Sequence, residues 1–430
     1  MADTSPPDEG RSAGRKGGER SGKVADFRYK RPFQPDNKRR PRNDRGRKGN
    51  NGHTSKNGSA HSNPLNAVPA HPNSSNNRDG GSPRPVVARH GRPGEAYAAL
   101  DLGTNNCRLL IARPSGKDFT VIDAFSRVVK LGEDLAMTGR LSDEAMDRAL
   151  GALSVCADKL RRRKVRLARS VATEACRRAS NGADFIERVK QETGIVLDII
   201  SAEEEARLAV LGCHILLEQG DGYAVIFDIG GGSTELVLVE PDGKVPRIID
   251  WQSVPWGVVS LTDTVGRGEG HEQARRDRYG RMRELVSDSF APFAERITEA
   301  SRKDDIRLLG TSGTVTTLAS LHLELPHYDR KAVDGLIVPS QSMREISSRL
   351  SCMSPAERGE LPCIGQDRAD LVVAGCAILE SILDLWPAER LGVADRGIRE
   401  GILRSLMAAE RQSERSLQAL QELRMGKPDQ

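Results

Sequence analysis

Apolar positions follow two patterns along the chain from about residue 95 onward. Short apolar runs, which predict buried strands, alternate with longer segments in which apolar residues recur every three or four positions, which predict helices. Three strands followed by helix–strand units occur twice. The expected strands are 96–102, 107–113, 118–126, 167–173, 196–200, 222–229, 234–240, 245–253, 306–309 and 390–394. The expected helices are 142–163, 184–191, one entered at Ser201, 256–264, 271–300, 313–321, 340–351, 367–385 and 398–411. This alternation predicts an α/β architecture with mixed sheets.

One polar motif is written twice, each time between two apolar runs. The copies are Asp101-Leu-Gly-Thr-Asn-Asn and Asp228-Ile-Gly-Gly-Gly-Ser-Thr-Glu235. A Gly-rich link between two short apolar runs predicts a hairpin. The aligned pairs are Asp101 with Asp228, Gly103 with Gly230, Asn106 with Ser233 and Arg108 with Glu235. Two such hairpins in register predict a duplicated domain with a phosphate held between the halves.

The hairpin tips have the chemistry of a phosphate cradle. Glycine lets backbone N–H groups approach an anion, hydroxyls donate to it, and an Asp can hold a hydrated divalent cation. The predicted phosphate-binding residues of the tips are Thr104, Asn105, Asn106, Gly230, Gly231, Gly232 and Ser233. Asp101 and Asp228 could hold the cation, and Glu235 could orient a metal-bound or attacking water. A tight turn with no ligand is the alternative for each tip.

Three further segments carry candidate chemistry. Ser201 and Glu204 match a helix capping box, which leaves Glu205 as a carboxylate that could take a proton from water. Arg177 and Arg178 follow a strand, where a guanidinium can bind phosphate oxygens bidentately; a surface salt bridge is the alternative. The third segment opens the expected helix at 313 and predicts N-terminal anion donors, with a plain helix start as the alternative. Its predicted phosphate-binding residues are Ser312, Gly313 and Thr314.

The first part of the chain differs from the rest in composition. Residues 1–90 contain 19 Lys/Arg and 8 Asp/Glu, a net charge of +11; since the whole chain carries +5, the remainder carries −6. Residues 1–94 are rich in Gly, Ser, Asn and Pro and cannot bury enough apolar surface to offset ordering, so they predict a disordered tail. The basic stretch 30–48 could bind RNA or another polyanion; a solvated tail without a partner is the alternative.

The bulk composition narrows the class of protein. The seven cysteines form no CxxC pair, which is typical of reduced, structural thiols. No apolar run reaches the roughly 18 residues of a membrane span, and the N-terminus has no apolar signal core. We therefore expect a cytoplasmic protein without membrane contact. From the repeated order of strands and helices we expect two domains, residues 95–216 and 217–397, and a helix at about 398–415 that completes the first domain.

The motifs taken together resemble the exopolyphosphatase/guanosine pentaphosphate phosphohydrolase (Ppx/GppA) family. They occur in family order over roughly residues 95–410. The matching features are Asp101-Leu-Gly-Thr-Asn, Thr173-x-Ala-x-Arg177-x-Ala-x-Asn181, Ser201-x-x-Glu-Glu-Ala-Arg-Leu208, Asp228-Ile-Gly-Gly-Gly-Ser-Thr-Glu235, Ser312-Gly-Thr314 and Arg399-Glu-Gly401. Asn106 departs from the family, in which Ser is frequent at this position. The chain resembles the short form, without the additional C-terminal helical domain of longer members.

The resemblance implies a fold and an activity. The fold is the actin-like pair of ribonuclease H-like domains shared with sugar kinases and heat-shock chaperone ATPases. The activity is Mg²⁺-dependent removal of a terminal phosphoryl group from polyphosphate or guanosine pentaphosphate, and a homodimer is compatible with it. By position, Glu205 resembles the catalytic base, Asp228 and Glu235 resemble the residues that set the metal and the water, and Arg177 belongs to the phosphate cradle. The two competing hypotheses are an actin-like kinase or ATPase, and a non-catalytic module that binds a polyanion.

Overall fold

The computed structural model describes residues 25–26, 94–116, 118–220, 222–241, 245–267, 270–301 and 306–425. The predicted tail therefore lies almost entirely outside the described residues, as does its basic stretch. Within the described ranges, no helix is both long enough and apolar enough to cross a membrane.

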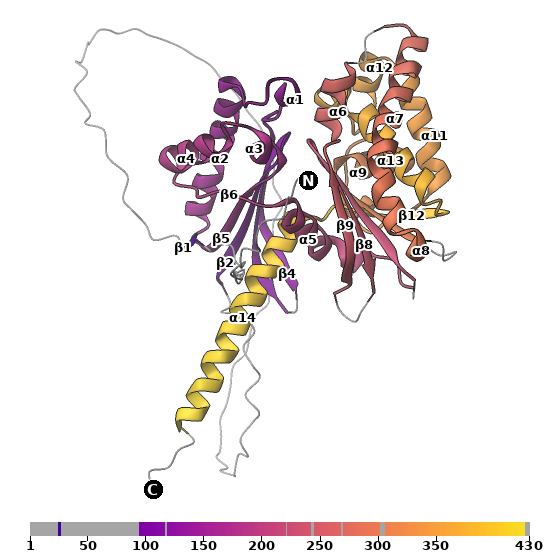
Figure 1. The fold of residues 1–430 in the computed structure, drawn as a ribbon. Helices are drawn as coiled ribbons and strands as arrows, with labels where there is room; N and C mark the ends of the chain where they lie inside the picture. The colour runs from indigo at the N-terminus through magenta and orange to yellow at the C-terminus, as the bar shows by residue number, and fades with distance from the viewer. Residues whose placement is uncertain are drawn as a thin grey trace, which may run out of the picture. The chain divides into compact units, whose positions relative to one another are not determined.

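The first sheet is built around a central pair of parallel strands (Figure 1). β2 pairs antiparallel with β3, β3 pairs antiparallel with β4, and β5 and β6 continue in parallel on the other side of β2. β1 pairs antiparallel with β5. The strands are β1 (Ala25–Asp26), β2 (Ala96–Leu102), β3 (Asn106–Ser115), β4 (Asp118–Val128), β5 (Val165–Ala172) and β6 (Asp198–Ile199).

The second sheet repeats this topology. Its order β9-β8-β7-β10-β12 corresponds strand by strand to β4-β3-β2-β5-β6, with the same parallel and antiparallel pairs, and β11 is added on β12. The strands are β7 (Ala224–Ile229), β8 (Thr234–Glu240), β9 (Arg247–Val254), β10 (Arg307–Thr311), β11 (Ile337–Pro339) and β12 (Arg390–Ala394). The predicted α/β fold of duplicated ribonuclease H-like halves, the actin-like architecture, is confirmed.

Helices cover both faces of each sheet. α2 and α4 bury one face of the first sheet, and α7, α11 and α13 cover one face of the second (Figure 1). The α-helices are α1 (Leu135–Thr138), α2 (Asp143–Arg162), α3 (Glu174–Arg178), α4 (Gly182–Thr193), α5 (Ala202–Cys213), α6 (Val258–Val265), α7 (Glu272–Arg296), α8 (Thr298–Ser301), α9 (Gly313–His322), α10 (Arg330–Val333), α11 (Ser340–Cys352), α12 (Pro355–Glu360), α13 (Leu371–Leu385) and α14 (Ile398–Met425). Two 3-10 turns are η1 (His214–Leu216) and η2 (Gln366–Arg368).

α5 and α14 form the layer between the sheets. Leu208 of α5 packs with α14 on the first sheet, whereas Ala206 and Val210 of α5 face the second. The two helix backbones touch, because a Cβ added at Gly401 would lie 2.0 Å from the carbonyl oxygen of Leu208. Glycine is therefore required at this crossing, and the contact ties the two halves of the chain together.

Four predicted elements differ from the structure in their bounds. The strand predicted at 196–200 is reduced to Asp198–Ile199, because it pairs with β5 only over two residues. The helix predicted at 367–385 is split into η2 and α13, and the helix predicted at 271–300 ends at Arg296 before the short α8. α14 continues to Met425, beyond the predicted residue 411, because the prediction followed the apolar face that packs on the sheet.

Candidate functional site

A cavity of about 160 Å³ lies where the two hairpin tips meet the first turns of α9 and α14. It is lined by residues from both sheets, and it brings together segments more than 290 positions apart in sequence. The predicted site residues that line it are Asp101, Thr104, Asn105, Asn106, Glu205, Asp228, Gly230, Gly231, Gly232, Ser233, Glu235, Ser312, Gly313 and Thr314. The two candidate arginines, Arg177 and Arg178, are not among the lining residues. Arg178 Nε lies 3.8 Å from Glu174 Oε1, as in the salt-bridge alternative.

The second tip is held from behind by the start of α6. The carbonyl oxygen of Gly230 accepts from the N–H of Val258 at 3.0 Å, and that of Gly231 accepts from Val259 at 2.8 Å. Ser260 Oγ donates to the carbonyl oxygen of Gly232 at 3.0 Å. Because the C=O and N–H of a trans peptide unit point in opposite directions, the following N–H groups point away from α6. The loop thereby presents a row of donors suited to an anion.

The first tip is held in the same way. The carbonyl oxygen of Thr104 accepts from Gly132 N–H at 2.9 Å, and that of Asn105 accepts from Val129 at 2.9 Å. The next N–H groups, those of Asn105 and Asn106, therefore point to the opposite side. Both tips are also closed by equivalent bonds of 2.9 Å, from Gly103 N–H to the Asn106 carbonyl and from Gly230 N–H to the Ser233 carbonyl. The repeat in the sequence is thus a repeat in backbone geometry.

The two tips approach each other closely. A Cβ added at Gly231 would lie 3.0 Å from Thr104 Cβ, and one added at Gly232 would lie 2.6 Å from Thr104 Oγ1 and 2.9 Å from Glu174 Cγ. Only residues without a side chain fit at these two positions without displacing the opposite tip. The second and third glycines of the motif therefore have a packing reason.

Two aspartates lie at matching positions beside the cavity. In the hairpin registers, Asp101 is opposite Arg108 and Asp228 is opposite Glu235. Burial raises the pKa of Asp101, and Arg108 and Arg399 oppose this effect. Burial also raises the pKa of Asp228 to about 6; Arg108 lowers it, and repulsion from Asp101 adds to it. The aspartates therefore share a site in which negative charge is unfavourable without a counter-ion.

Glu235 is a buried carboxylate held by two hydroxyls. Ser233 Oγ donates to Glu235 Oε1 at 2.6 Å, and Ser253 Oγ donates to the same oxygen at 2.9 Å. Burial raises the pKa of Glu235 to about 7, repulsion from Asp228 adds to this, and the two serines and Arg177 oppose it. A carboxyl group with such a pKa can exchange a proton near neutral pH.

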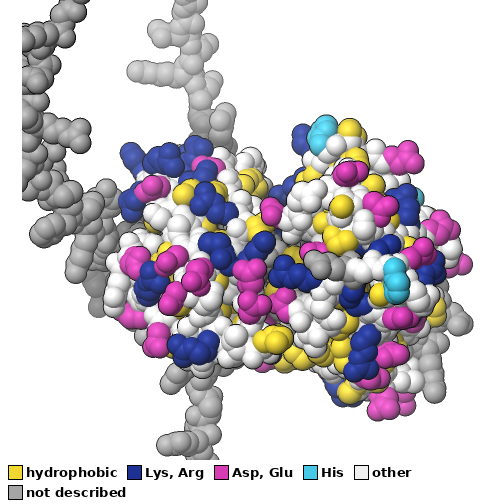
Figure 2. Space-filling view, turned by 90° about the horizontal axis from the view of Figure 1, so that it is seen from above, with side chains coloured by type: hydrophobic (Ala, Val, Ile, Leu, Met, Phe, Trp, Pro, Cys, Tyr) yellow, Lys and Arg dark blue, Asp and Glu magenta, His cyan; other side chains and the backbone are white. Residues whose placement is uncertain are grey.

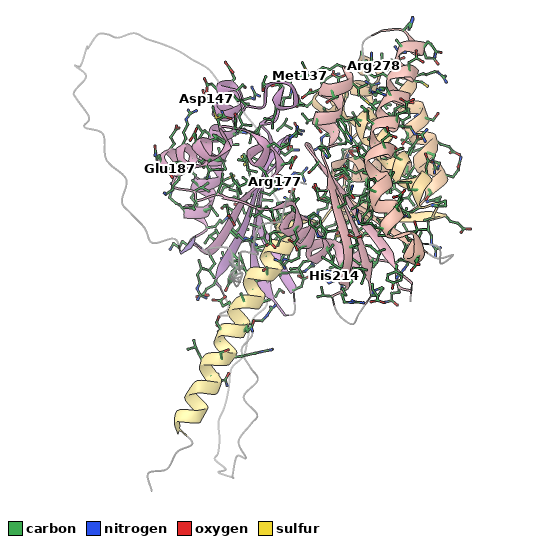
Figure 3. All side chains as sticks on the ribbon, in the orientation of Figure 1. Met137, Asp147, Arg177, Glu187, His214 and Arg278 are labelled. Carbon is green, nitrogen blue, oxygen red and sulfur yellow. The ribbon has the colours of Figure 1, made fainter. Side chains whose placement is uncertain are left out.

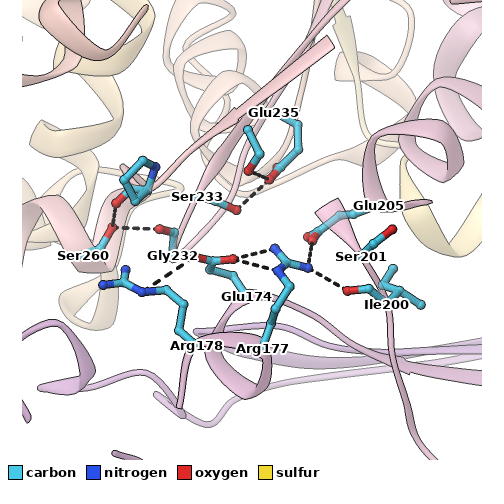
Figure 4. Close-up of polar contacts among 12 residues, drawn as sticks. Glu174, Arg177, Arg178, Ile200, Ser201, Glu205, Gly232, Ser233, Glu235 and Ser260 are labelled. Carbon is cyan, nitrogen blue, oxygen red and sulfur yellow. Dashed lines mark hydrogen bonds and ion pairs between the residues drawn. The ribbon is translucent and has the colours of Figure 1, made fainter. Parts of the chain in front are cut away.

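Glu205 lies at the start of α5, where its side chain meets that of Arg177 (Figure 4). It is 6% exposed. Burial raises the pKa of its carboxyl group, and repulsion from Glu235 adds to this effect. Arg177 Nη1 donates to Glu205 Oε2 at 3.0 Å and opposes the shift. Ser201 accepts from the N–H of Glu204 as the predicted helix cap. The structure therefore separates the three adjacent acids, because Glu203 is exposed and Glu204 pairs with Arg169 and Arg207, outside the cavity.

The start of α9 contributes a strained serine. Ser312 has a φ of 113°, a backbone conformation that non-glycine residues rarely adopt, and its buried Oγ has no hydrogen-bond partner among the residues that the structure describes. Such strain persists where surrounding structure enforces it, frequently at ligand sites. With Gly313 and Thr314, this serine places an unused hydroxyl and a helix N-terminus at the cavity wall.

Sequence reasoning missed the arginines of the cavity. Arg108 and Arg368 line it, as do Arg396 and Arg399 at the entry to α14. In the alignment of the two hairpin motifs Arg108 corresponds to Glu235, and this correspondence could have identified Arg108 as a cavity residue from the sequence. The first turn of α14 is held by Glu400, which accepts from Gly397 N–H and from Arg330. The arginines supply positive charge to a cavity whose lining also includes six carboxylates, those of Asp101, Glu174, Glu205, Asp228, Glu235 and Asp395.

The oxygen donors of the cavity fit a hard divalent cation. Asp101 Oδ1 is buried without a hydrogen-bond partner, and Asp228 and Glu235 have raised pKa values that a cation would lower. Within the described ranges, no three His, Cys, Asp or Glu residues are grouped to enclose a metal ion. This is compatible with Mg²⁺, which proteins usually hold through one or two carboxylates, with water and substrate phosphates completing the shell.

Comparisons with known proteins agree with this geometry. A model of the Ppx/GppA phosphatase family matches residues 110–410. The chain is 30% identical over 323 residues to the protein named Exopolyphosphatase 2 of Mycobacterium tuberculosis, covering 72% of this chain and 98% of that protein.

Solved structures are similar over about three quarters of the chain. The Aquifex aeolicus member of the Ppx/GppA family is 29% identical with a TM-score of 0.61, covering 74% of this chain and 98% of that one. An exopolyphosphatase from Cytophaga hutchinsonii is 24% identical with a TM-score of 0.64, covering 73% and 98% of the two chains, and shows the shared fold.

Proposed function

The chain belongs to the Ppx/GppA phosphatase family, and on that premise we propose that it hydrolyses the terminal phosphoryl group of inorganic polyphosphate in the cavity between the two hairpin tips. The observation that carries this proposal is the meeting of two donor loops with buried Glu205 and Glu235. The protein is a phosphoric anhydride hydrolase, like its relatives that are named exopolyphosphatases.

The terminal phosphate is bound by groups from both hairpins. Thr104, Asn105 and Asn106 donate from one side, and Gly230–Ser233 donate from the other, with Ser312, Gly313 and Thr314 at the α9 end. Phosphoryl transfer depends mainly on positioning and on charge stabilisation, so preorganised donors account for much of the rate. Each missing donor of this kind typically costs about 10²–10³ in rate.

Glu205 accepts the proton of the attacking water. Its burial beside the cavity and the pKa that this burial raises suit a carboxylate that accepts a proton from water. Glu235, fixed by Ser233 and Ser253, orients the same water. For Arg177 to bind the phosphate, as its motif predicts, it has to exchange its bond with Glu205 for a phosphate oxygen.

Asp101, Asp228 and Glu235 would hold the divalent cation, for which we propose Mg²⁺. When bound, it would neutralise charge on the phosphate oxygens and help to orient water. Its positive charge would also favour the ionised forms of the three carboxyl groups.

Linear polyphosphate is the favoured substrate, and guanosine pentaphosphate is the second. Among the described residues that line the cavity there is no aromatic side chain on which a guanine could stack. On the face shown in Figure 2, basic side chains are interspersed with acidic ones, which favours short rather than long polyphosphate. Two predictions stay untested by the described part of the chain. One is that the tail binds a polyanion, and the other is that the protein forms a homodimer.

The test is release of inorganic phosphate from both substrates, measured side by side with Mg²⁺ and with ATP as a third substrate. We expect polyphosphate to be cleaved with the highest kcat/KM. Preferred hydrolysis of ATP would favour the kinase or ATPase hypothesis, and no release from any substrate would favour a binding module. Repeating the assay without residues 1–90 shows whether the tail contributes to polyphosphate affinity; an unchanged KM would remove that role.

A further inference from the structure

Glu174 is a cavity-lining residue to which the sequence motifs assign no role. It opens α3, its side chain is 13% exposed, and it faces the tip of the second hairpin near Gly232. Its carboxylate oxygen Oε2 accepts from two nitrogens of Arg177, from Nε at 3.0 Å and from Nη2 at 2.5 Å (Figure 4). Glu174 is therefore the main anchor of the Arg177 side chain.

All three nitrogens of the Arg177 guanidinium are engaged. Besides the contacts with Glu174, Nη1 donates to the carbonyl oxygen of Ile200 at 2.8 Å and to Glu205 Oε2 at 3.0 Å. Arg177 thus connects α3 to the residue before the cap of α5, and it projects toward the space between the two sheets (Figure 3). A planar guanidinium fixed at two edges has little freedom to turn, so its remaining contact, with Glu205, is directional.

The contact of Arg177 with Glu205 orients the carboxylate that we assign as the base. With Oε2 occupied by Arg177, the other oxygen, Oε1, is the one left for a water in the cavity. An Arg177 without its anchor could rotate away or bind the substrate phosphate instead. In either case Glu205 would lose the bond that fixes its orientation.

We propose that Glu174 is a positioning residue that holds Arg177 against Glu205 and so aims the free oxygen of Glu205 into the cavity. This inference rests on the proposed hydrolysis. It gives Arg177 a task that it performs through Glu205, in addition to the direct phosphate contact. A bare helix-start ion pair would stabilise α3 but would leave the rate constant of hydrolysis unchanged.

The first experiment compares steady-state phosphate release from short polyphosphate by the wild type, Glu174→Ala, Arg177→Ala and the double variant. We expect Glu174→Ala to lower kcat by about 10- to 100-fold, the size typical of losing the partner that orients a ligand, with KM changed less than threefold. The double variant should be no slower than Arg177→Ala, because the two residues act as one unit.

Chemical rescue separates positioning from folding. Guanidinium ion added to Arg177→Ala can occupy the space between Glu174 and Glu205, so we expect it to restore at least tenfold in kcat. The same addition to the double variant should restore less than twofold, because the anchor is missing. Glu174→Gln serves as the second variant if Glu174→Ala does not fold, since it keeps the shape of the side chain and removes its charge.

The matched control is Glu204→Gln, which breaks a comparable ion pair with Arg169 and Arg207 outside the cavity. We expect its kcat to stay within twofold of wild type. The inference is overturned if Glu174→Ala and Glu174→Gln keep wild-type kcat, if their losses multiply with that of Arg177→Ala, or if guanidinium rescues both backgrounds equally. Absence of phosphate release by the wild type would instead refute the proposed hydrolysis.

Discussion

Replacing Asp228 with Asn should stabilise the metal-free protein at pH 8 and leave its stability at pH 4 unchanged. Burial and repulsion from Asp101 raise the pKa of Asp228 from 3.8 to about 6 in the folded chain, although Arg108 opposes them. Between these values the folded chain binds more protons than the unfolded chain does, so the free energy of unfolding falls as pH rises. Above about pH 7 Asp228 is ionised in both states, so the folded chain carries the full free-energy cost of the buried charge.

The size of the effect follows from the shift. Roughly two pKa units at 1.36 kcal/mol per unit correspond to about 3 kcal/mol. Because Asp228 is partly accessible from the cavity, we expect the Asn variant to recover about 1–3 kcal/mol at pH 8. For a domain of 150–250 residues, about 2–4 °C in Tm accompanies each kcal/mol.

The assay is thermal unfolding followed by circular dichroism, in EDTA, at half-unit steps from pH 4 to pH 8. Asp277→Asn, at an exposed position on α7, is the control and should match wild type throughout. An Asp228→Asn variant whose Tm at pH 8 equals or falls below that of wild type would refute the reasoning. So would a gain at pH 4 as large as that at pH 8, because it would not come from ionisation.

Four further outcomes are expected. Glu205→Gln should lower kcat by about 10²–10⁴, the usual contribution of a general base, without lowering Tm; activity within threefold of wild type would contradict its role. Gly232→Ala should lower kcat about 10²-fold, since its Cβ would lie 2.6 Å from Thr104 Oγ1 and push the tips apart. The kcat of this variant is compared with that of Gly151→Ala on α2, a control in which the added Cβ meets open space. Ser253→Ala removes a bond that lowers the pKa of Glu235, so the acidic limb of the pH–kcat profile should move to higher pH; an unmoved limb would separate Glu235 from proton transfer. EDTA should abolish phosphate release, and excess Mg²⁺ should restore it. Mg²⁺ should also raise Tm, because it binds the folded state, and a fluorescence melt with and without Mg²⁺ measures this shift in Tm.

Local structure could be predicted from the sequence because its causes are local. The period of apolar residues predicted every strand of the two sheets except β1 and β11. Ser142 and Ser201 cap α2 and α5 as predicted, each accepting from a backbone N–H three residues ahead. The duplicated hairpins were predicted in register, and both tips have the same closing hydrogen bond. These features depend on neighbours within a few positions.

The site was predictable as far as the motifs carry it. Glu205 and Glu235 both line one cavity, and the roles that the resemblance implies for them stay predictions. The capping box singled out Glu205 from the three adjacent acids, and the packing of α5 between the sheets makes it the buried one. The motif singled out Arg177, but the sequence could not show that the carboxylates of Glu174 and Glu205 bind its guanidinium.

The tertiary structure alone determined where the cavity charges meet. Arg108 and Arg399 are 291 positions apart, yet both line the cavity and both act on Asp101, because α14 returns to pack against α5 and the first sheet. No periodicity or spacing records such a contact, since it depends on how two sheets are brought together by the helices between them. The sequence by itself determined most of the strands, the caps and the two donor loops, because these depend on neighbouring residues. The pKa values and the arginine contacts come from burial and from distances between remote segments.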